Sequence, residues 1–163
     1  MLVSKEEVFN FLPHKPPFLF VDTVESVTIP ENIDKENISS KDLVGAKVIA
    51  HYSVREDLEI LAGHFPGNPI LPGVIQVEMM AQSSAFMTLA LNDMKLEGMK
   101  VETLLLGVDN AKFRKPIFPG MDLEIHATMD KCRGQMATYH CEIYSAGEKV
   151  SEAKFLAQIK VNL

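Results

Sequence analysis

The stretch from Gly63 to Gln82 reads GHFPGNPILPGVIQVEMMAQ, and the rest of the chain is organised around it. Its first half is rich in glycines and prolines, which predicts an ordered, turn-rich loop. From Val74 to Leu91 apolar residues fall on every side, which predicts a helix that is buried all round. Glu78 lies inside this helix, where a carboxylate is costly unless it is paired, neutral or functional. Together with His64 on the preceding loop, it is the candidate for chemistry.

Composition indicates a globular protein of one domain, residues 1–163. The 163 residues are 47% hydrophobic and 23% charged, enough for a continuous core. A net charge of −6 without a long basic block argues against nucleic acid as a partner. The N-terminus has no basic region followed by an apolar run, and the uncharged stretches, interrupted at Glu78, are too short to span a bilayer. We therefore expect a soluble cytoplasmic protein.

The two cysteines are predicted to be free and structural. The two strands that hold them carry apolar residues at odd positions, so a hairpin between them must pair odd with odd. A loop of three or five residues around Gly134 satisfies this requirement. It places Cys132 at the turn end and Cys141 opposite Ile125 or Ala127, too far apart to bond.

The N-terminal third predicts one short helix and two strands. Ser4 and Glu7 form a capping box that opens the helix. The first strand is expected from Phe18 to Ile29 and the second over residues 44–54. His14, in the proline-rich segment before the first strand, is either an ordinary loop histidine or part of a site entrance.

The polar segment 30–43, between these strands, is expected to be a long loop with at most a helical turn. It has no sustained apolar period. A solvated insert that tolerates changes of sequence and length is favoured over a functional one. Shortening residues 31–41 is therefore expected to leave function intact.

The C-terminal half predicts four β-rich stretches, over residues 101–113, 121–130, 136–145 and 149–161. The last three alternate in and out over most of their length and are joined by glycine-bearing turns, which indicates an antiparallel meander. A helix that is apolar on all sides must be wrapped by this sheet, so the fold class is α+β.

Four segments carry a resemblance to a known family. They are GHFPGNPILPG followed by Glu78 and MAQ, LPHKPPFLFVD (12–22), GVDNAKFRKPIFPG (107–120) and the C-terminal strands. This pattern resembles the (3R)-hydroxyacyl-acyl carrier protein dehydratases, FabZ type, of dissociated (type II) fatty acid synthesis. The resemblance implies the hot dog fold, a long central helix wrapped by a curled sheet.

The candidate site has one group for each step of such a dehydration. A neutral His64 is a suitable base for the C2 proton. Gly73, at the probable first helical turn, offers a free N–H to a thioester oxyanion. Glu78 could donate a proton to the leaving hydroxyl, if apolar surroundings retain that proton, or hold the hydroxyl in place. The resemblance further implies that the carbonyl of Ile70 orients the imidazole and that Gln82 supports the site. It also implies the simple dehydratase, because members that also isomerise the double bond carry Asp at the acid position.

Two further groups of side chains have alternative readings. The first is either ordinary core or the lining of the acyl tunnel that the resemblance implies: Met79, Met80, Phe86 and Met87. The second group flanks Phe113, whose side chain is expected to point inward. These basic side chains are either solvated charges on the edge of the sheet or a docking surface for the acidic acyl carrier protein: Lys112, Arg114 and Lys115.

The sequence thus predicts a hydro-lyase without metal or other cofactor. Its partner is acyl carrier protein bearing a phosphopantetheine-linked 3-hydroxyacyl chain. The resemblance implies a homodimer with shared sites, alone or as a trimer of dimers. The alternatives are a hot dog thioesterase, an acyl-CoA hydratase or a non-catalytic acyl-binding module. General fatty acid synthesis, lipid A supply and a polyene route are all compatible, with any chain length.

Overall fold

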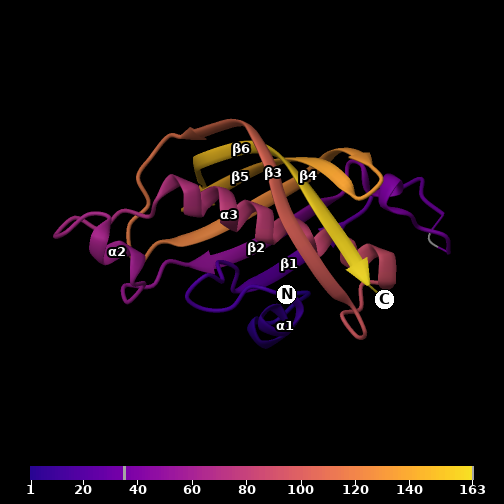
Figure 1. Ribbon diagram of the computed structural model, residues 1–163, viewed down its shortest axis with the longest axis horizontal. Helices are drawn as coiled ribbons and strands as arrows, with labels where there is room; N and C mark the ends of the chain where they lie inside the picture. Colours follow the sequence, from indigo (N-terminus) through magenta and orange to yellow (C-terminus); the bar gives the residue numbers. More distant parts are fainter. Residues whose placement is uncertain (35, 163) are drawn as a thin grey trace.

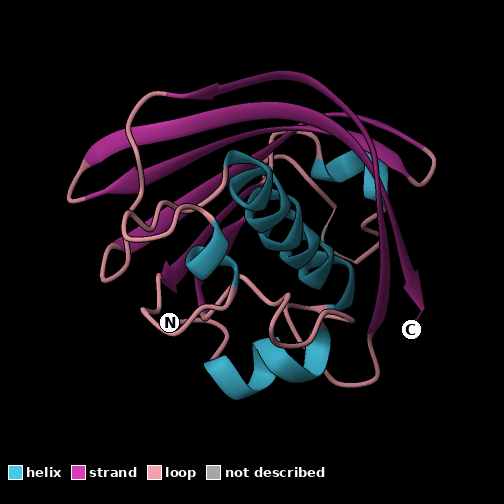
Figure 2. Cartoon of the chain, turned by 60° about the vertical axis from the view of Figure 1, so that its left-hand side comes forward, coloured by secondary structure: helices cyan, strands magenta, loops and turns pink. Residues whose placement is uncertain are grey.

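The fold was examined in a computed structural model, which describes residues 1–34 and 36–162. A long helix, α3, lies against one face of an antiparallel six-stranded sheet that curls around it (Figures 1 and 2). The strand order is β1-β2-β4-β5-β6-β3. The expected plan of a buried helix wrapped by a curled sheet is confirmed. The strands are β1 Thr23–Thr28, β2 Lys47–Ser53, β3 Lys100–Phe113, β4 Asp122–Arg133, β5 Met136–Ser145 and β6 Glu148–Asn162; the helices are α1 Lys5–Phe11, α2 Ile60–Gly63 and α3 Gly73–Ser84, with 3-10 turns η1 Ser40–Leu43 and η2 Ala85–Asn92.

The buried helix changes its winding part of the way along. It is α-helical to Ser84 and continues as the 3-10 helix η2, whereas one α-helix over 74–91 was expected. The hydroxyls of Ser83 and Ser84 donate to the carbonyls four residues back, Met79 and Met80, and so compete with the helical N–H groups. This competition accompanies the change of winding at Ala85.

The helical run Gly73–Asn92 is long and apolar enough, by length and composition alone, to cross a membrane. However, 78% of its apolar window is buried inside the domain, as expected for the core helix of a soluble protein. Helix α1, opened by the expected capping box of Ser4 and Glu7, packs against the η2 part of this run. There the rings of Phe11 and Phe86 lie 5.0 Å apart.

The first strand is shorter than predicted. Strand β1 begins at Thr23 rather than at residue 18, because Phe18 and Phe20 bond to a side chain of α3 instead of to a neighbouring strand. In the polar segment the described residues are mostly exposed. The segment ends in η1, which is capped by Ser39 and buries Leu43. The part that should tolerate shortening therefore ends before Ser39.

The hairpin between β4 and β5 pairs odd with odd residues, as predicted, but by a different device. Its loop has two residues, since Arg133 pairs with Met136, and so the pairing next to the turn joins odd with even residues. A β-bulge between Met129 and Lys131 shifts the register by one residue, and beyond it odd residues pair with odd ones. Cys141 lies opposite Ala127, one of the two expected partners, and both cysteines are free.

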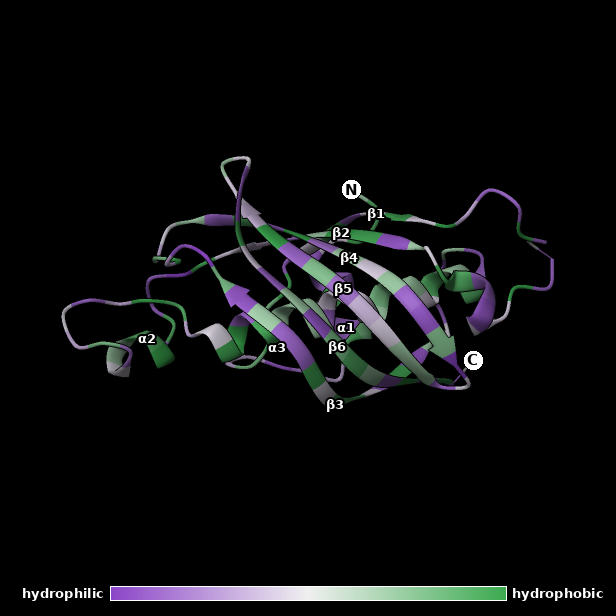
Figure 3. Ribbon diagram, turned by 90° about the horizontal axis from the view of Figure 1, so that it is seen from above, coloured by the Kyte–Doolittle hydropathy of each residue, from purple (hydrophilic) through white to green (hydrophobic). Residues whose placement is uncertain are grey.

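Strand β3 forms one edge of the sheet and pairs only with β6. Along β4 and β5 hydrophobic and hydrophilic residues alternate over most of the length, as the colours of Figure 3 show. Buried positions alternate with more exposed ones in the same strands. Strand β3 differs, because most of it is exposed. Its edge leaves apolar side chains uncovered at Leu104, Leu105, Leu106 and Val108, which are 43–60% exposed.

Candidate active site

His64 is held by its own loop in a single orientation. Its Nδ1 lies 2.7 Å from the Ile70 carbonyl oxygen, and the Ile70 N–H donates to the His64 carbonyl at 2.7 Å. A carbonyl oxygen only accepts hydrogen bonds, so Nδ1 carries the proton in this arrangement. In the neutral ring Nε2 is then unprotonated. The ring is partly exposed and stacks on Phe65, at a centroid distance of 4.1 Å.

Gly73 is the first residue of α3, directly after the N-cap Pro72. Its N–H makes no hydrogen bond within the described residues, as is usual for the first turn of a helix. A Cβ atom built on Gly73 would lie 2.8 Å from the ring of Phe113, so only glycine lets this ring close over the helix start. The expectation that Phe113 points inward is wrong in part, because its side chain is 49% exposed.

Glu78 faces two donors on one carboxylate oxygen. His14 Nε2 lies 3.2 Å from Glu78 Oε1, and Gln82 Nε2 donates to the same oxygen at 3.0 Å. The hydrogen bond from His14 and, more weakly, that from Gln82 lower the pKa of Glu78 below its ordinary 4.5, although partial burial acts the other way. Within one subunit these contacts favour the carboxylate form of Glu78, whereas retention of its proton would require apolar surroundings to outweigh them.

Gln82 ties the helix to the segment before β1. Its side chain is fully buried, its Oε1 accepts from the Phe20 N–H at 2.8 Å, and its Nε2 also donates to the Phe18 carbonyl at 3.0 Å. One amide thus satisfies two backbone groups and Glu78. This contact brings the segment that contains His14 onto α3.

His14 lies at the candidate site, although the sequence by itself favoured an ordinary loop histidine. Its Nδ1 is buried without a hydrogen-bond partner among the described residues, while Nε2 faces Glu78. The available signal was its place between two prolines in a segment that resembles the dehydratases. Sequence alone could not show that this segment lies beside the middle of α3.

The side chains that were candidates for an acyl tunnel belong to the core. Met79, Met80, Phe86 and Met87 are completely buried and serve as core within the single chain. An apolar cleft of about 330 Å³ lies instead beside the segment held by Gln82, and it is lined by Pro17, Phe18, Phe20, Leu58, Glu59 and Ile60.

The basic residues next to Phe113 are partly neutralised. Arg114 pairs with Glu152 at 3.0 Å and Lys115 pairs with Glu148. Lys112 is exposed and makes no ion pair within the described residues. Because Phe113 lies over Gly73, these cations stand next to the start of α3.

His64 and Glu78 are not joined within one chain. No hydrogen bond or ion pair links them among the residues that the structure describes. Glu78 lies five residues beyond Gly73, which corresponds to about 7.5 Å along the helix axis. Within one subunit the two side chains therefore have different partners, the Ile70 carbonyl for His64 and His14 with Gln82 for Glu78.

A curled antiparallel sheet around a central helix, with a histidine on the loop before that helix and a glutamate inside it, defines a dehydratase of the hot dog class. The sequence model of the ApeI-like family, ApeI dehydratase, matches residues 39–154. The chain belongs to this dehydratase family.

Similar proteins agree with this assignment. The chain is 34% identical over 154 residues to the 3-hydroxyacyl-acyl-carrier-protein dehydratase FabZ of Erythrobacter litoralis, covering 94% of this chain and 91% of that protein. It is also 34% identical over 161 residues to the FabZ of Rickettsia felis, covering 98% of both. Among solved structures, the dehydratase heterocomplex ApeI:P from Xenorhabdus doucetiae superposes with a TM-score of 0.67 at 19% identity, covering 93% of this chain and 89% of that one. This last likeness shows the fold.

Proposed function

We propose that this chain, as one domain, dehydrates (3R)-hydroxyacyl chains carried on acyl carrier protein to the trans-2-enoyl product. Besides family membership, the observation that carries the proposal is the hydrogen bond between His64 Nδ1 and the Ile70 carbonyl. It leaves Nε2 of a neutral imidazole free to act as a base at neutral pH. No metal or other cofactor is required, because each step is assigned to a group of the chain.

The elimination starts at C2 of the acyl chain. His64 Nε2 takes the C2 proton while the thioester oxygen gains negative charge. The open N–H of Gly73, at the positive end of the α3 dipole, stabilises this oxyanion. As the C2–C3 double bond forms, the C3–O bond breaks and the hydroxyl takes a proton to leave as water.

The contacts of His14 and Gln82 with Glu78 favour its carboxylate form and so support another group as the source of that proton. A deprotonated Glu78 cannot donate, so it accepts a hydrogen bond from the substrate hydroxyl and holds it in place. The imidazolium of His64 then returns the proton to the leaving hydroxyl. This assignment keeps the second of the two roles that the sequence suggested for Glu78.

We further propose that His64 of one subunit works with Glu78 of the partner subunit in a homodimer, alone or as three dimers in a hexamer. Two exposed apolar features support this arrangement because a second copy could cover them: the edge of β3, and Val74, which is 75% exposed at the start of α3. Separation of the two catalytic residues within one chain supports the same arrangement.

Acyl carrier protein would dock beside the start of α3, at Lys112, Arg114 and Lys115. Lys112 has no ion pair among the described residues, and Phe113 places all three next to the oxyanion position. An acidic carrier gains local attraction there despite the net charge of −6. We also propose that the protein works in the cytoplasm, because its one long apolar helical run is mostly buried inside the domain.

The test uses two inactive variants, His64→Ala and Glu78→Ala. Each is expected to lower turnover by at least about two orders of magnitude, followed as enoyl absorbance on 3-hydroxyacyl carrier substrates of several lengths. Refolding the two variants together gives mixed dimers in about half of the population, and each mixed dimer has one intact site if sites are shared. Roughly a quarter of all sites should then recover.

A tag on one variant confirms the exchange of subunits. Activity that stays at the level of the separate variants would refute the shared site while leaving the dehydratase assignment intact. Release of free thiol instead of enoyl product would identify a thioesterase, and acyl binding without turnover of the unaltered protein would identify a non-catalytic module.

A further inference from the structure

A cluster of metal-ligating side chains lies on the outer face of the sheet, away from α3. Three neighbouring strands each contribute one residue: Glu25 from β1, His51 from β2 and Glu124 from β4. Their ligand atoms all lie within 4.8 Å of one another, and His51 Nε2 is 2.8 Å from Glu25 Oε2. Such convergence from three strands is a stronger feature than a pair of exposed charges.

The sheet itself positions these residues. His51 and Glu124 are directly opposite partners in the β2–β4 pairing, so they share one face. Glu25 falls at the register shift between Val24 and Ser26, where β1 carries a bulge. A bulge re-aims a side chain, and here it sets the Glu25 carboxylate against His51.

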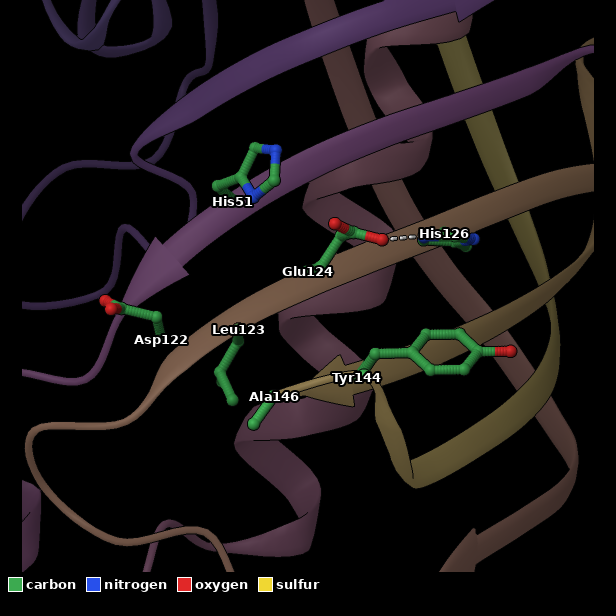
Figure 4. Close-up of a pocket in the computed structure, with 8 residues that line it drawn as sticks. His51, Asp122, Leu123, Glu124, His126, Tyr144 and Ala146 are labelled. Carbon is green, nitrogen blue, oxygen red and sulfur yellow. Dashed lines mark hydrogen bonds and ion pairs between the residues drawn. The ribbon is translucent and has the colours of Figure 1, made fainter.

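A fourth side chain supports the cluster. His126, two residues after Glu124 on β4, hydrogen-bonds through Nε2 to Glu124 Oε1. Figure 4 shows Glu124 between His51 and His126, with the two rings on neighbouring strands. His51, Glu124 and His126 border an open cavity of about 590 Å³, which leaves room for a water molecule on a bound ion.

We propose that Glu25, His51 and Glu124 bind a zinc ion, with His126 orienting Glu124. One imidazole and two carboxylates are ligands that zinc accepts, and three protein ligands leave a fourth position open to water. Bond lengths of about 2.0–2.2 Å place tetrahedral ligands about 3.4 Å apart. The widest separation of 4.8 Å therefore needs to close by roughly 1.4 Å, and the His51–Glu25 pair at 2.8 Å needs to open by roughly 0.6 Å.

The site is distinct from the catalytic residues. Along β4 the residues on either side of Glu124, Leu123 and Ile125, are buried on the opposite face of the sheet, which packs on α3. The ion would join the edge strand β1 to its neighbour β2 and to β4, the next strand beyond β2. Its expected effect is on stability, with the dehydration chemistry unchanged.

Isothermal titration of the chelator-treated protein with zinc chloride tests the proposal. We expect one ion per chain with a dissociation constant in roughly the micromolar range. At free zinc of about 100 times that constant, the melting temperature should rise by roughly 5 °C or more. His51→Ala should weaken binding by about 100-fold, and His126→Ala by about tenfold, since it removes only the orienting group.

A matched control is His140→Ala, which removes another exposed imidazole from the outer face of β5. It should bind zinc as the unaltered protein does, and His51→Ala should keep normal dehydratase activity. The proposal is overturned if the unaltered protein binds no zinc. It is also overturned if His51→Ala binds as tightly as the unaltered protein, or if His140→Ala loses as much affinity as His51→Ala.

Discussion

Replacing Gln82 by leucine should disturb both the fold and the site. The side chains have similar size, so the change removes hydrogen bonds without opening a cavity. Three bonds disappear: one from the Phe20 N–H at 2.8 Å, and one each to Phe18 O and to Glu78 at 3.0 Å. Because Phe20 is buried, its N–H is left without a partner.

The expected cost follows from these contacts. A buried, unsatisfied N–H costs about 1–3 kcal/mol, and each of the other two bonds contributes about 0.5–1.5 kcal/mol. After the gain from burying an apolar side chain, the free energy of unfolding should fall by about 2–4 kcal/mol. For a chain of this size that lowers the melting temperature by roughly 5–15 °C.

Gln76→Leu is the matched control. Gln76 is also buried on α3, but it makes a single hydrogen bond, to Leu71 O at 3.2 Å, and its Oε1 has no partner among the described residues. Removing a weak bond together with an unsatisfied oxygen should change stability by less than about 1 kcal/mol.

Urea unfolding of both variants at one protein concentration supplies the measurement, since self-association makes stability depend on concentration. Equal losses of unfolding free energy in the two variants would contradict this prediction. They would show that the loss comes from replacing a buried amide, and not from the hydrogen bonds that link Gln82 to Phe18 and Phe20. A Gln82→Leu protein as stable as the unaltered one would contradict it outright.

Three further predictions concern the carboxylates and the polar segment. His14→Ala should raise the pKa of Glu78, because the substitution removes the hydrogen bond from His14, which is the largest cause of the lowered pKa. Carbon NMR of the Glu78 carboxyl group as a function of pH measures this change. Lys149 and, second to it, Arg114 hold the pKa of Glu152 at about 2, below its ordinary 4.5, so these ion pairs should add stability above pH 4.5 that is lost as pH falls toward 2. Lys149→Met should therefore reduce stability more at pH 7 than at pH 3 in urea unfolding. Replacing residues 31–38 by a short turn should leave the dehydration rate within about twofold.

Different results would count against each of these. An unchanged Glu78 titration would mean that His14 does not govern this carboxylate. An equal stability loss at both pH values would attribute the effect of Lys149 to packing. A large loss of rate with an unchanged melting temperature would show that the polar segment contributes to the site.

The sequence alone determined the plan of the fold and the family. Period-two alternation, glycine-bearing turns and an all-round apolar helix are local patterns, and each was sufficient to predict an element and its surroundings. The capping box at Ser4 was predicted for the same reason, because its partner is three residues away. The loop of His64 also follows from local residues, since Ile70 lies close to it in the chain.

Tertiary structure decided what depends on contacts between distant residues. Sequence could not show that Gln82 captures Phe18 and Phe20 and so shortens the first strand, nor that His14 reaches Glu78 and lowers its pKa. Sequence also could not show that a bulge, and not the loop length, sets the register of the hairpin between β4 and β5. Nor could it show that a second bulge, in β1, points Glu25 toward His51. Protonation states and side-chain clusters depend on which groups meet in space. That is set by the curl and register of the whole sheet, which no single stretch of sequence contains.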